Sequence, residues 1–213
     1  MSHGPDEERT LVSRELWSQD EGARDAVFVV FILVSNKDMH FAALVDSLLR
    51  SDLEDGTRIV VSYDGENPVM RHLGEKLQQR FAVSHIVHPF ACASAETRKG
   101  FPKYVAKRRR SVHKAICVKH HWFWAMHNVF QYFHKAQWLY YLEEDFLVSK
   151  HIGTVAKDLM RLADASDAYM GAMTQCRDNL WTVSGLLKRS AWHALLQRAE
   201  FFCSFDDPNW FVC

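Results

Sequence analysis

The sequence predicts an α/β domain with a mostly parallel central sheet and flanking helices. Short apolar, β-branched runs alternate along the chain with segments of helical spacing, a pattern typical of parallel strands joined by crossover helices. The run AVFVVFILV at 26–34 is apolar throughout, as expected for a strand that is buried on both faces. Because 213 residues suffice for one sizeable core, we expect a polar lead-in over 1–24 and one domain over 25–213.

The individual elements follow from their apolar periods and from the residues at their ends. Pro68 is expected to open the second helix, because its missing N–H is tolerated in the first helical turn. Ser190 is expected near the N-terminal cap of the last helix. In chain order, the sequence predicts a strand at 26–35, a helix at 39–51, a strand at 57–64, a helix at 68–81, a strand at 83–89, a loop over 90–111, a long helix at 111–134 that is either continuous or broken, a strand at 137–143, a helix at 155–165, strands at 168–174 and 182–188, and a helix at 190–202.

The composition excludes several classes of protein. The 26 Lys and Arg residues balance 26 Asp and Glu residues, so no overall field favours a polyanionic partner. No apolar run approaches the roughly 20 residues of a membrane span, and the N-terminal 1–25 lacks the apolar segment of a signal peptide. The five cysteines are scattered and include no CxxC pair, which gives no disulfide framework. Taken alone, these features predict a soluble cytosolic protein.

Three acidic residues end the strand predicted at 137–143. Glu143, Glu144 and Asp145 follow an apolar, aromatic run and are followed at once by further apolar residues. In open α/β sheets, ligands collect at the carboxyl ends of the strands, and carboxylates there suit Mg²⁺ or Mn²⁺. A cation would neutralise the repulsion among the three acids. The alternative interpretation is a solvated acidic loop with no ligand.

Polar residues also follow two other predicted strands. Asn36 and Lys37 come after the first strand, and Asp64 ends the second. Each residue alone is ordinary turn chemistry. Their convergence with the three acids on one edge of the sheet predicts a binding site there.

The predicted long helix carries a cluster of possible metal ligands. Cys117, His120, His121 and His127 occur within CVKHHWFWAMH, but their spacing matches no closed zinc pattern. The neighbouring aromatic residues 122–124 cannot all lie on one helix face. Some of them are expected in the core, and the others along a cleft or a partner surface.

A basic run, RKGFPKYVAKRRRSVHK, occupies 98–114. Its simplest interpretation is a solvated loop. Nucleic-acid binding, a localisation signal and a site for an anionic sugar nucleotide are the alternatives.

Three segments together are similar to one glycosyltransferase family. KHHWFWAMHNVF, LYYLEEDFLVSKHI and FFCSFDDPNW resemble, in this order, motifs of the alpha-1,6-mannosyl-glycoprotein 2-beta-N-acetylglucosaminyltransferases, or N-acetylglucosaminyltransferase II. The resemblance covers about 26–210, with gaps. It implies a GT-A type, Rossmann-like nucleotide-sugar domain and an inverting transfer of GlcNAc from UDP-GlcNAc. The implied acceptor is the α-1,6-linked mannose of a glycoprotein N-glycan, joined in β-1,2 linkage, with Mn²⁺ as cofactor and the Golgi as location.

The resemblance also implies roles for individual residues. Asp145 corresponds to the family's metal-binding aspartate, and Arg177 to a substrate-binding arginine. Lys37 keeps the charge of the family's arginine but loses its bidentate fork. Cys117 and Val118 depart from the family's glutamine and threonine. The implied donor-binding residues are Leu33, Val34, Ser35, Asn36, Lys37, Asp64, Cys117, Val118, Lys119, His120 and His121.

The C-terminal part departs from the family at the catalytic position. Phe211 stands where the family has its general base, and Asp206 and Asp207 are the nearest carboxylates. The family's second metal ligand and the disulfide partner of Cys203 would lie beyond the last residue, and its membrane anchor is missing from this sequence. We therefore expect a C-terminally incomplete fragment of doubtful activity. The alternative to an enzyme is an inactive module of the same fold that binds a sugar nucleotide or a glycan.

Overall fold

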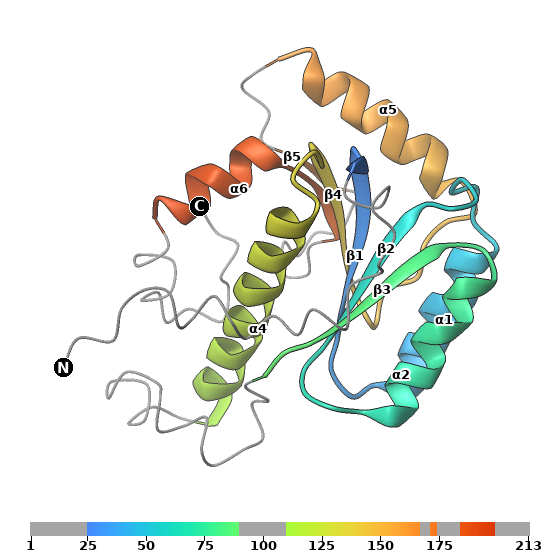
Figure 1. Ribbon diagram of the computed structural model, residues 1–213, viewed down its shortest axis with the longest axis vertical. Coiled ribbons are helices and arrows are strands. Elements are labelled where there is room, and N and C mark those ends of the chain that lie inside the picture. Colours follow the sequence, from blue (N-terminus) through green and yellow to red (C-terminus); the bar gives the residue numbers. More distant parts are fainter. Residues whose placement is uncertain (1–24, 90–109, 167–170, 174–183, 199–213) are drawn as a thin grey trace.

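A six-stranded sheet with the strand order β3-β2-β1-β4-β6-β5 forms the centre of the molecule (Figure 1). The computed structural model describes residues 25–89, 110–166, 171–173 and 184–198. Strands β1 to β4 pair in parallel, whereas β6 runs antiparallel to both β4 and β5. The strands are β1 Phe28–Val34, β2 Arg58–Tyr63, β3 Ala82–Val87, β4 Trp138–Glu143, β5 Gly171–Met173 and β6 Gly185–Lys188. The predicted α/β class with a mostly parallel sheet is confirmed.

The strand order reverses between β1 and β4. The chain places β2 and β3 outward on one side of β1, and then returns to add β4 on the other side. In open α/β sheets, such a reversal opens a ligand site beyond the carboxyl ends of the two neighbouring strands. The topology therefore predicts a ligand site at the residues that follow β1 and β4.

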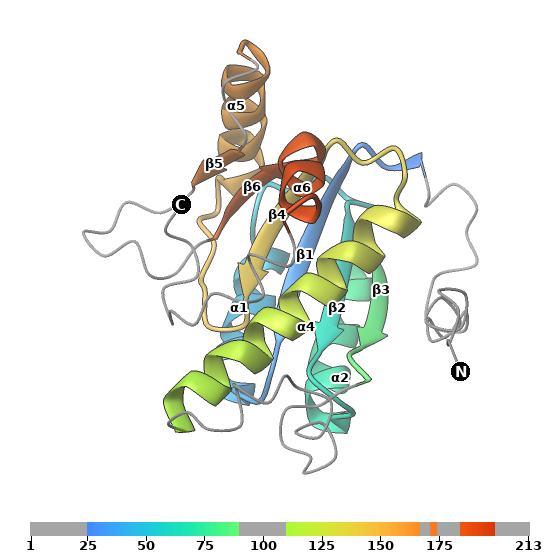
Figure 2. The same cartoon turned by 90° about the vertical axis from the view of Figure 1, so that its left-hand side faces the viewer.

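Helices cover both faces of the sheet (Figures 1 and 2). One core packs α1, α2 and α5 against one face, and the other packs α4 and α6 against the opposite face. Alternate residues of β1 serve the two cores: Val30 and Ile32 face the first, and Val29 and Phe31 face the second. The helices are α1 Asp38–Leu49, α2 Pro68–Glu75, the 3₁₀ helix η3 Lys76–Gln79, α4 Arg110–Tyr132, α5 Ile152–Asp164 and α6 Arg189–Leu196.

Two predicted helices differ from the structure in their details. The helix expected over 68–81 is α-helical only to Glu75 and continues as the 3₁₀ turn η3. Ser190 does not cap α6, because the helix already begins at Arg189 and its N-cap residue is Lys188, which makes no side-chain cap bond. The long helix α4 is continuous from Arg110 to Tyr132. Within the described residues, none of the helices combines the length and apolar character that crossing a bilayer requires.

The sheet and the helices are tied together at helix ends by side chains from distant segments. Asp52 accepts bonds from the backbone N–H groups of Gly153 and Thr154 at 2.5 and 3.1 Å, and so caps the N-terminus of α5. Arg189 donates to the backbone oxygens of Phe130 and Ala136 at 3.2 and 2.6 Å, at the C-terminal end of α4. These links hold the helices in fixed positions on the sheet.

Candidate functional site

The carboxyl ends of four parallel strands bring polar residues to one edge of the sheet. We call this edge the carboxyl edge; its residues are Ser35, Asn36 and Lys37 after β1, Asp64 after β2, His88 after β3, and Glu143, Glu144 and Asp145 at the end of β4. The α4 residues His120 and His121 complete it through contacts with His88. The convergence predicted from Asn36, Lys37, Asp64 and the three acids is present in the structure.

The three acids at the end of β4 have three different environments. Glu143 accepts a bond from the Tyr141 hydroxyl at 2.9 Å, and burial raises the pKa of its carboxyl above the usual value. Glu144 turns inward and is 4% exposed. Asp145 pairs with the Lys37 ammonium, and both side chains are partly exposed. In the described structure each of the three carboxylates thus has its own partner, which reduces the predicted repulsion among them without a cation.

Glu144 organises the loop that follows β1. Its carboxylate accepts the backbone N–H of Ser35 at 2.5 Å, and the N–H groups of Asn36 and Lys37 also bond to it. Burial raises the pKa of this carboxyl, and the three backbone bonds oppose that rise. The Glu144 backbone N–H in turn donates to the Leu33 oxygen at 3.0 Å. Glu144 therefore fixes the position of Asn36 and Lys37 at the carboxyl edge.

A second group at the edge consists of imidazoles and one carboxylate, which we call the histidine cluster: Asp64, His88, His120 and His121. Nδ1 of His88 lies 3.1 Å from Oδ1 of Asp64, and Nε2 of His88 lies 2.9 Å from Nδ1 of His120. The rings of His88 and His121 stack with their centres 4.8 Å apart. His88 and His121 are both buried, whereas the Asp64 side chain is 20% exposed.

Burial keeps the α4 histidines neutral at physiological pH. It lowers the pKa of His121 to about 3, and it lowers the pKa of His120 as well, with nearby His88 adding to both shifts. Ser62 orients the buried ring of His121 through its hydroxyl, which lies 2.8 Å from Nε2. A neutral imidazole offers one nitrogen as an acceptor or as a metal ligand.

The aromatic residues 122–124 of α4 all pack in or against the second core, and Trp124 also reaches the carboxyl edge. Trp122 is 4% exposed and packs edge-on against Tyr141 and Trp192. Trp124 lies against His88, with the ring centres 5.3 Å apart. His127 lies against Trp192 on the α6 side. The structure thus gives His121 and His127 different neighbours.

Some predicted site residues lie in the core or outside the described residues. The side chains of Leu33 and Val34 are buried, in the second and first cores respectively. Val118 is exposed on α4. The remaining predictions, which include the basic run 98–114, fall where the structure describes no side chains: Cys117, Lys119, Arg177, Asp206, Asp207 and Phe211.

His88 is the site residue that sequence reasoning missed. It directly follows β3 and precedes Pro89, in the same position relative to its strand as Asp64 has to β2, and the strand predicted at 83–89 included it. Its place at the end of a strand was the feature of the sequence that could have identified His88 as a site residue. Its significance depends on the α4 histidines, which approach it only in the folded chain.

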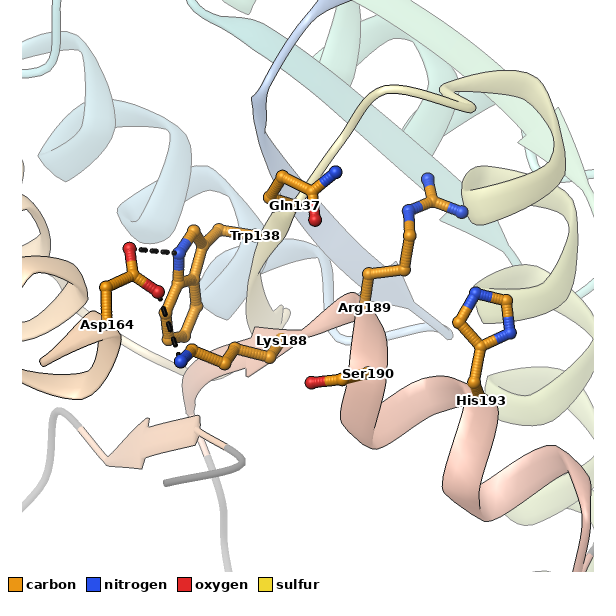
Figure 3. A pocket seen from close by; sticks show the side chains of 7 residues that line it. All are labelled: Gln137, Trp138, Asp164, Lys188, Arg189, Ser190 and His193. Carbon is orange, nitrogen blue, oxygen red and sulfur yellow. Dashed lines mark hydrogen bonds and ion pairs between the residues drawn. The ribbon is translucent and has the colours of Figure 1, made fainter. Parts of the chain in front are cut away.

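A hollow of about 350 Å³ lies at the opposite edge of the sheet (Figure 3). Its cations are already engaged. Lys188 donates to the Ala163 oxygen at 2.7 Å and pairs with Asp164 at 3.1 Å, while Arg189 binds the end of α4. The Trp138 indole donates to Asp164 at 3.3 Å. This hollow is therefore a structural junction, lined by Gln137, Trp138, Asp164, Lys188, Arg189, Ser190 and His193.

Comparisons with known proteins agree with the predicted fold. No protein-family model matches the chain. The chain is 24% identical over 228 residues to an alpha-1,6-mannosyl-glycoprotein 2-beta-N-acetylglucosaminyltransferase of Arabidopsis thaliana; the match covers 88% of this chain and 52% of that protein. The chain thus spans about half the length of the curated relative it matches. The resemblance read from the three motifs is confirmed by this match.

A solved structure supports the fold independently. The structure of S. aureus TarS 1–349 in complex with UDP is similar at a TM-score of 0.51 and 11% identity, covering 86% of this chain and 53% of that one. At this identity the likeness concerns the fold alone. Together with the sheet topology, it confirms the predicted GT-A type, Rossmann-like α/β fold.

Proposed function

We propose that this chain forms the nucleotide-sugar-binding part of an inverting N-acetylglucosaminyltransferase that uses UDP-GlcNAc. The observation that carries the proposal is the carboxyl edge at the β1–β4 reversal, where Asn36, Lys37, Asp64 and Asp145 converge. These are the residues to which the family resemblance assigns donor and metal binding. The similarity to an N-acetylglucosaminyltransferase over 88% of the chain supports the same conclusion.

The acceptor and location extend the proposal. The relative's name specifies transfer to an α-1,6-linked mannose of a glycoprotein. We accordingly assign the same acceptor, a mannose-terminated N-glycan joined in β-1,2 linkage, and a place in the Golgi lumen. Their support is the name of that relative and the motif resemblance.

The residues at Asp145 fit a hard divalent cation such as Mn²⁺. Carboxylate oxygens are the ligands that such cations prefer. Of the three acids, Glu144 is turned inward onto backbone N–H groups, whereas the Asp145 carboxylate is partly exposed and faces Lys37. A cation bound there would neutralise charge on the diphosphate leaving group. Lys37 supplies a further positive charge at the same edge.

The chain's own residues would hold the donor at defined positions. Glu144 fixes the backbone of Ser35, Asn36 and Lys37, so that three of the predicted donor contacts are preorganised. Asp64 lies 3.1 Å from Nδ1 of His88, and its side chain is 20% exposed at the edge. The edge thus presents cationic and acceptor groups side by side, as a nucleoside diphosphate requires.

An inactive binding module of the same fold is the second candidate. The observation that favours it is Phe211, which occupies the family's base position and cannot take a proton from the acceptor hydroxyl. A positioned base typically contributes 10²- to 10⁴-fold to a rate. Asp206 and Asp207 are the carboxylates nearest in sequence that would replace it.

Calorimetry and a transfer assay together test both candidates. We expect UDP-GlcNAc to bind in the presence of Mn²⁺, and Asp145→Asn to weaken this Mn²⁺-dependent binding. Asp158→Asn is the matched control, because Asp158 is an exposed acid on α5 that pairs with its neighbour Arg161. Binding without GlcNAc transfer to a mannose-terminated N-glycan would select the inactive module. Donor affinity unaffected by Asp145→Asn would contradict the metal assignment.

A further inference from the structure

Three ligand groups of the histidine cluster have the arrangement of a metal site. One ligand atom each from Asp64, His88 and His121 can be chosen so that all three lie within 4.8 Å of one another. A single ion placed among them can bind all three once the side chains shift inward slightly, because zinc holds nitrogen and oxygen ligands at about 2.0–2.2 Å. We propose that Asp64, His88 and His121 bind a zinc-type transition-metal ion, at a site separate from Asp145.

The ligands come from three segments that the fold holds in place. Asp64 and His88 directly follow the neighbouring parallel strands β2 and β3, and the backbone N–H of His88 donates to the Tyr63 oxygen at 2.8 Å. His121 lies in the part of α4 whose next residue, Trp122, is packed in the second core. A site built on strand ends and a packed helix needs little rearrangement to accept an ion.

Both imidazoles have an outer partner of the kind that metal-binding histidines use. Nε2 of His88 lies 2.9 Å from Nδ1 of His120, while its Nδ1 faces Asp64. The Ser62 hydroxyl lies 2.8 Å from Nε2 of His121. Such hydrogen bonds fix the tautomer and the orientation of a ligating ring. They also distinguish this cluster from a chance meeting of surface histidines.

The set of ligand atoms selects the metal. Two imidazole nitrogens and one carboxylate oxygen suit Zn²⁺ or Co²⁺, whereas Mn²⁺ and Mg²⁺ prefer an all-oxygen environment. Three protein ligands leave a coordination position for water or for an oxygen of a bound ligand. The Asp64 side chain is 20% exposed, so solvent reaches at least this side of the site.

Metal binding there would interfere with the donor. The family resemblance assigns both Asp64 and His121 to the binding of UDP-GlcNAc, so occupancy by zinc should weaken UDP binding. This consequence rests on the proposed function. The metal site itself does not, because it depends only on the three side chains.

Cobalt spectroscopy on the full chain tests the site without an activity measurement. We expect Co²⁺ to give the visible d–d absorption of a four-coordinate ion, saturating at one ion per chain, with Zn²⁺ displacing it and Mn²⁺ failing to do so. His88→Gln and Asp64→Asn should abolish the absorption. His85→Gln is the matched control, because His85 is another buried histidine of the same sheet, bonded instead to Tyr63 at 2.9 Å.

Circular dichroism would establish that each variant is folded. If His88→Gln proves unstable, Asp64→Asn still tests the site, because it changes a side chain that is only partly buried. An absorption that survives in both variants, or that has the charge-transfer band of a thiolate ligand, would overturn the proposal. Displacement of Co²⁺ by equimolar Mn²⁺ would also overturn it. A cobalt spectrum that UDP leaves unchanged would retain the metal site and contradict the shared location of the donor.

Discussion

Glu144 is the residue on which the geometry of the β1 loop depends. Glu144→Ala removes the acceptor of the Ser35, Asn36 and Lys37 N–H groups, and we expect the free energy of unfolding to fall by about 1–3 kcal/mol. Glu144→Gln keeps one oxygen and should lose less. Urea denaturation measures both, with Asp158→Ala as the control, since an exposed i,i+3 pair contributes little. Equal stability of Glu144→Ala and the control would show that the loop does not need this carboxylate.

His85 should make the protein sensitive to acid. Burial, with a smaller effect of Arg71, lowers its pKa from 6.5 to about 4. The folded state therefore favours the neutral ring, so its contribution is complete above pH 6.5 and is lost as the pH falls toward 4. The loss amounts to at most about 3 kcal/mol. Stability measured from pH 7 to 4 should decline less steeply in His85→Gln, and parallel curves for the two proteins would refute the assignment.

The N-terminus of α5 depends on a cap that is remote in sequence. His151, the residue in the N-cap position, makes no side-chain cap bond, and Asp52 supplies the missing acceptors from the segment after α1. Asp52→Ala should therefore cost about 0.5–2 kcal/mol, the usual range for a lost cap. Glu54→Ala is the control, because it removes only an exposed pair with Lys157. If both variants unfold at the same urea concentration, Asp52 does not act as a cap.

Arg189 joins the start of α6 to the end of α4. Its guanidinium donates to the backbone oxygens of Phe130, Phe133 and Ala136, at and just beyond the C-terminal end of α4. Arg189→Met should destabilise the protein by about 2–4 kcal/mol, because several charge-assisted bonds are lost together. Arg189→Lys should recover only part of this, since an ammonium cannot reproduce the fork. Thermal unfolding of the two variants tests the difference, and full rescue by lysine would show that charge alone suffices.

At the scale of the whole molecule, the strands of the sheet could be predicted from the sequence, but the roles of individual site residues could not. The apolar runs that form β1, β2 and β4 identify these strands in the sequence, because each strand is buried on both faces. The convergence of Asn36, Lys37 and Asp64 followed from parallel strand ends alone.

The separate roles of Glu143, Glu144 and Asp145 could not be foreseen. They depend on the turn closed by the bond from Phe146 N–H to the Glu143 oxygen at 3.1 Å, which sends neighbouring carboxylates in different directions. His88 escaped notice for a related reason. Nothing near it in sequence indicates that the α4 histidines lie 32 and 33 positions further along but within bonding or stacking distance.

The bond between Ser35 and Glu144 joins residues 109 positions apart, and this separation bears on how the protein folds. The β3-β2-β1 half with α1 and α2 consists of neighbouring segments, so it can form from comparatively local contacts. The central β1–β4 pair must instead close a long chain segment before any of its contacts compensate the lost entropy. On the ribosome, the first half would emerge with the β4 side of β1 uncovered and with the loop at 35–37 unsupported. The carboxyl edge would then be completed only when β4 docks, so a chain arrested before that step would be partly folded and would lack the complete site of the proposed donor.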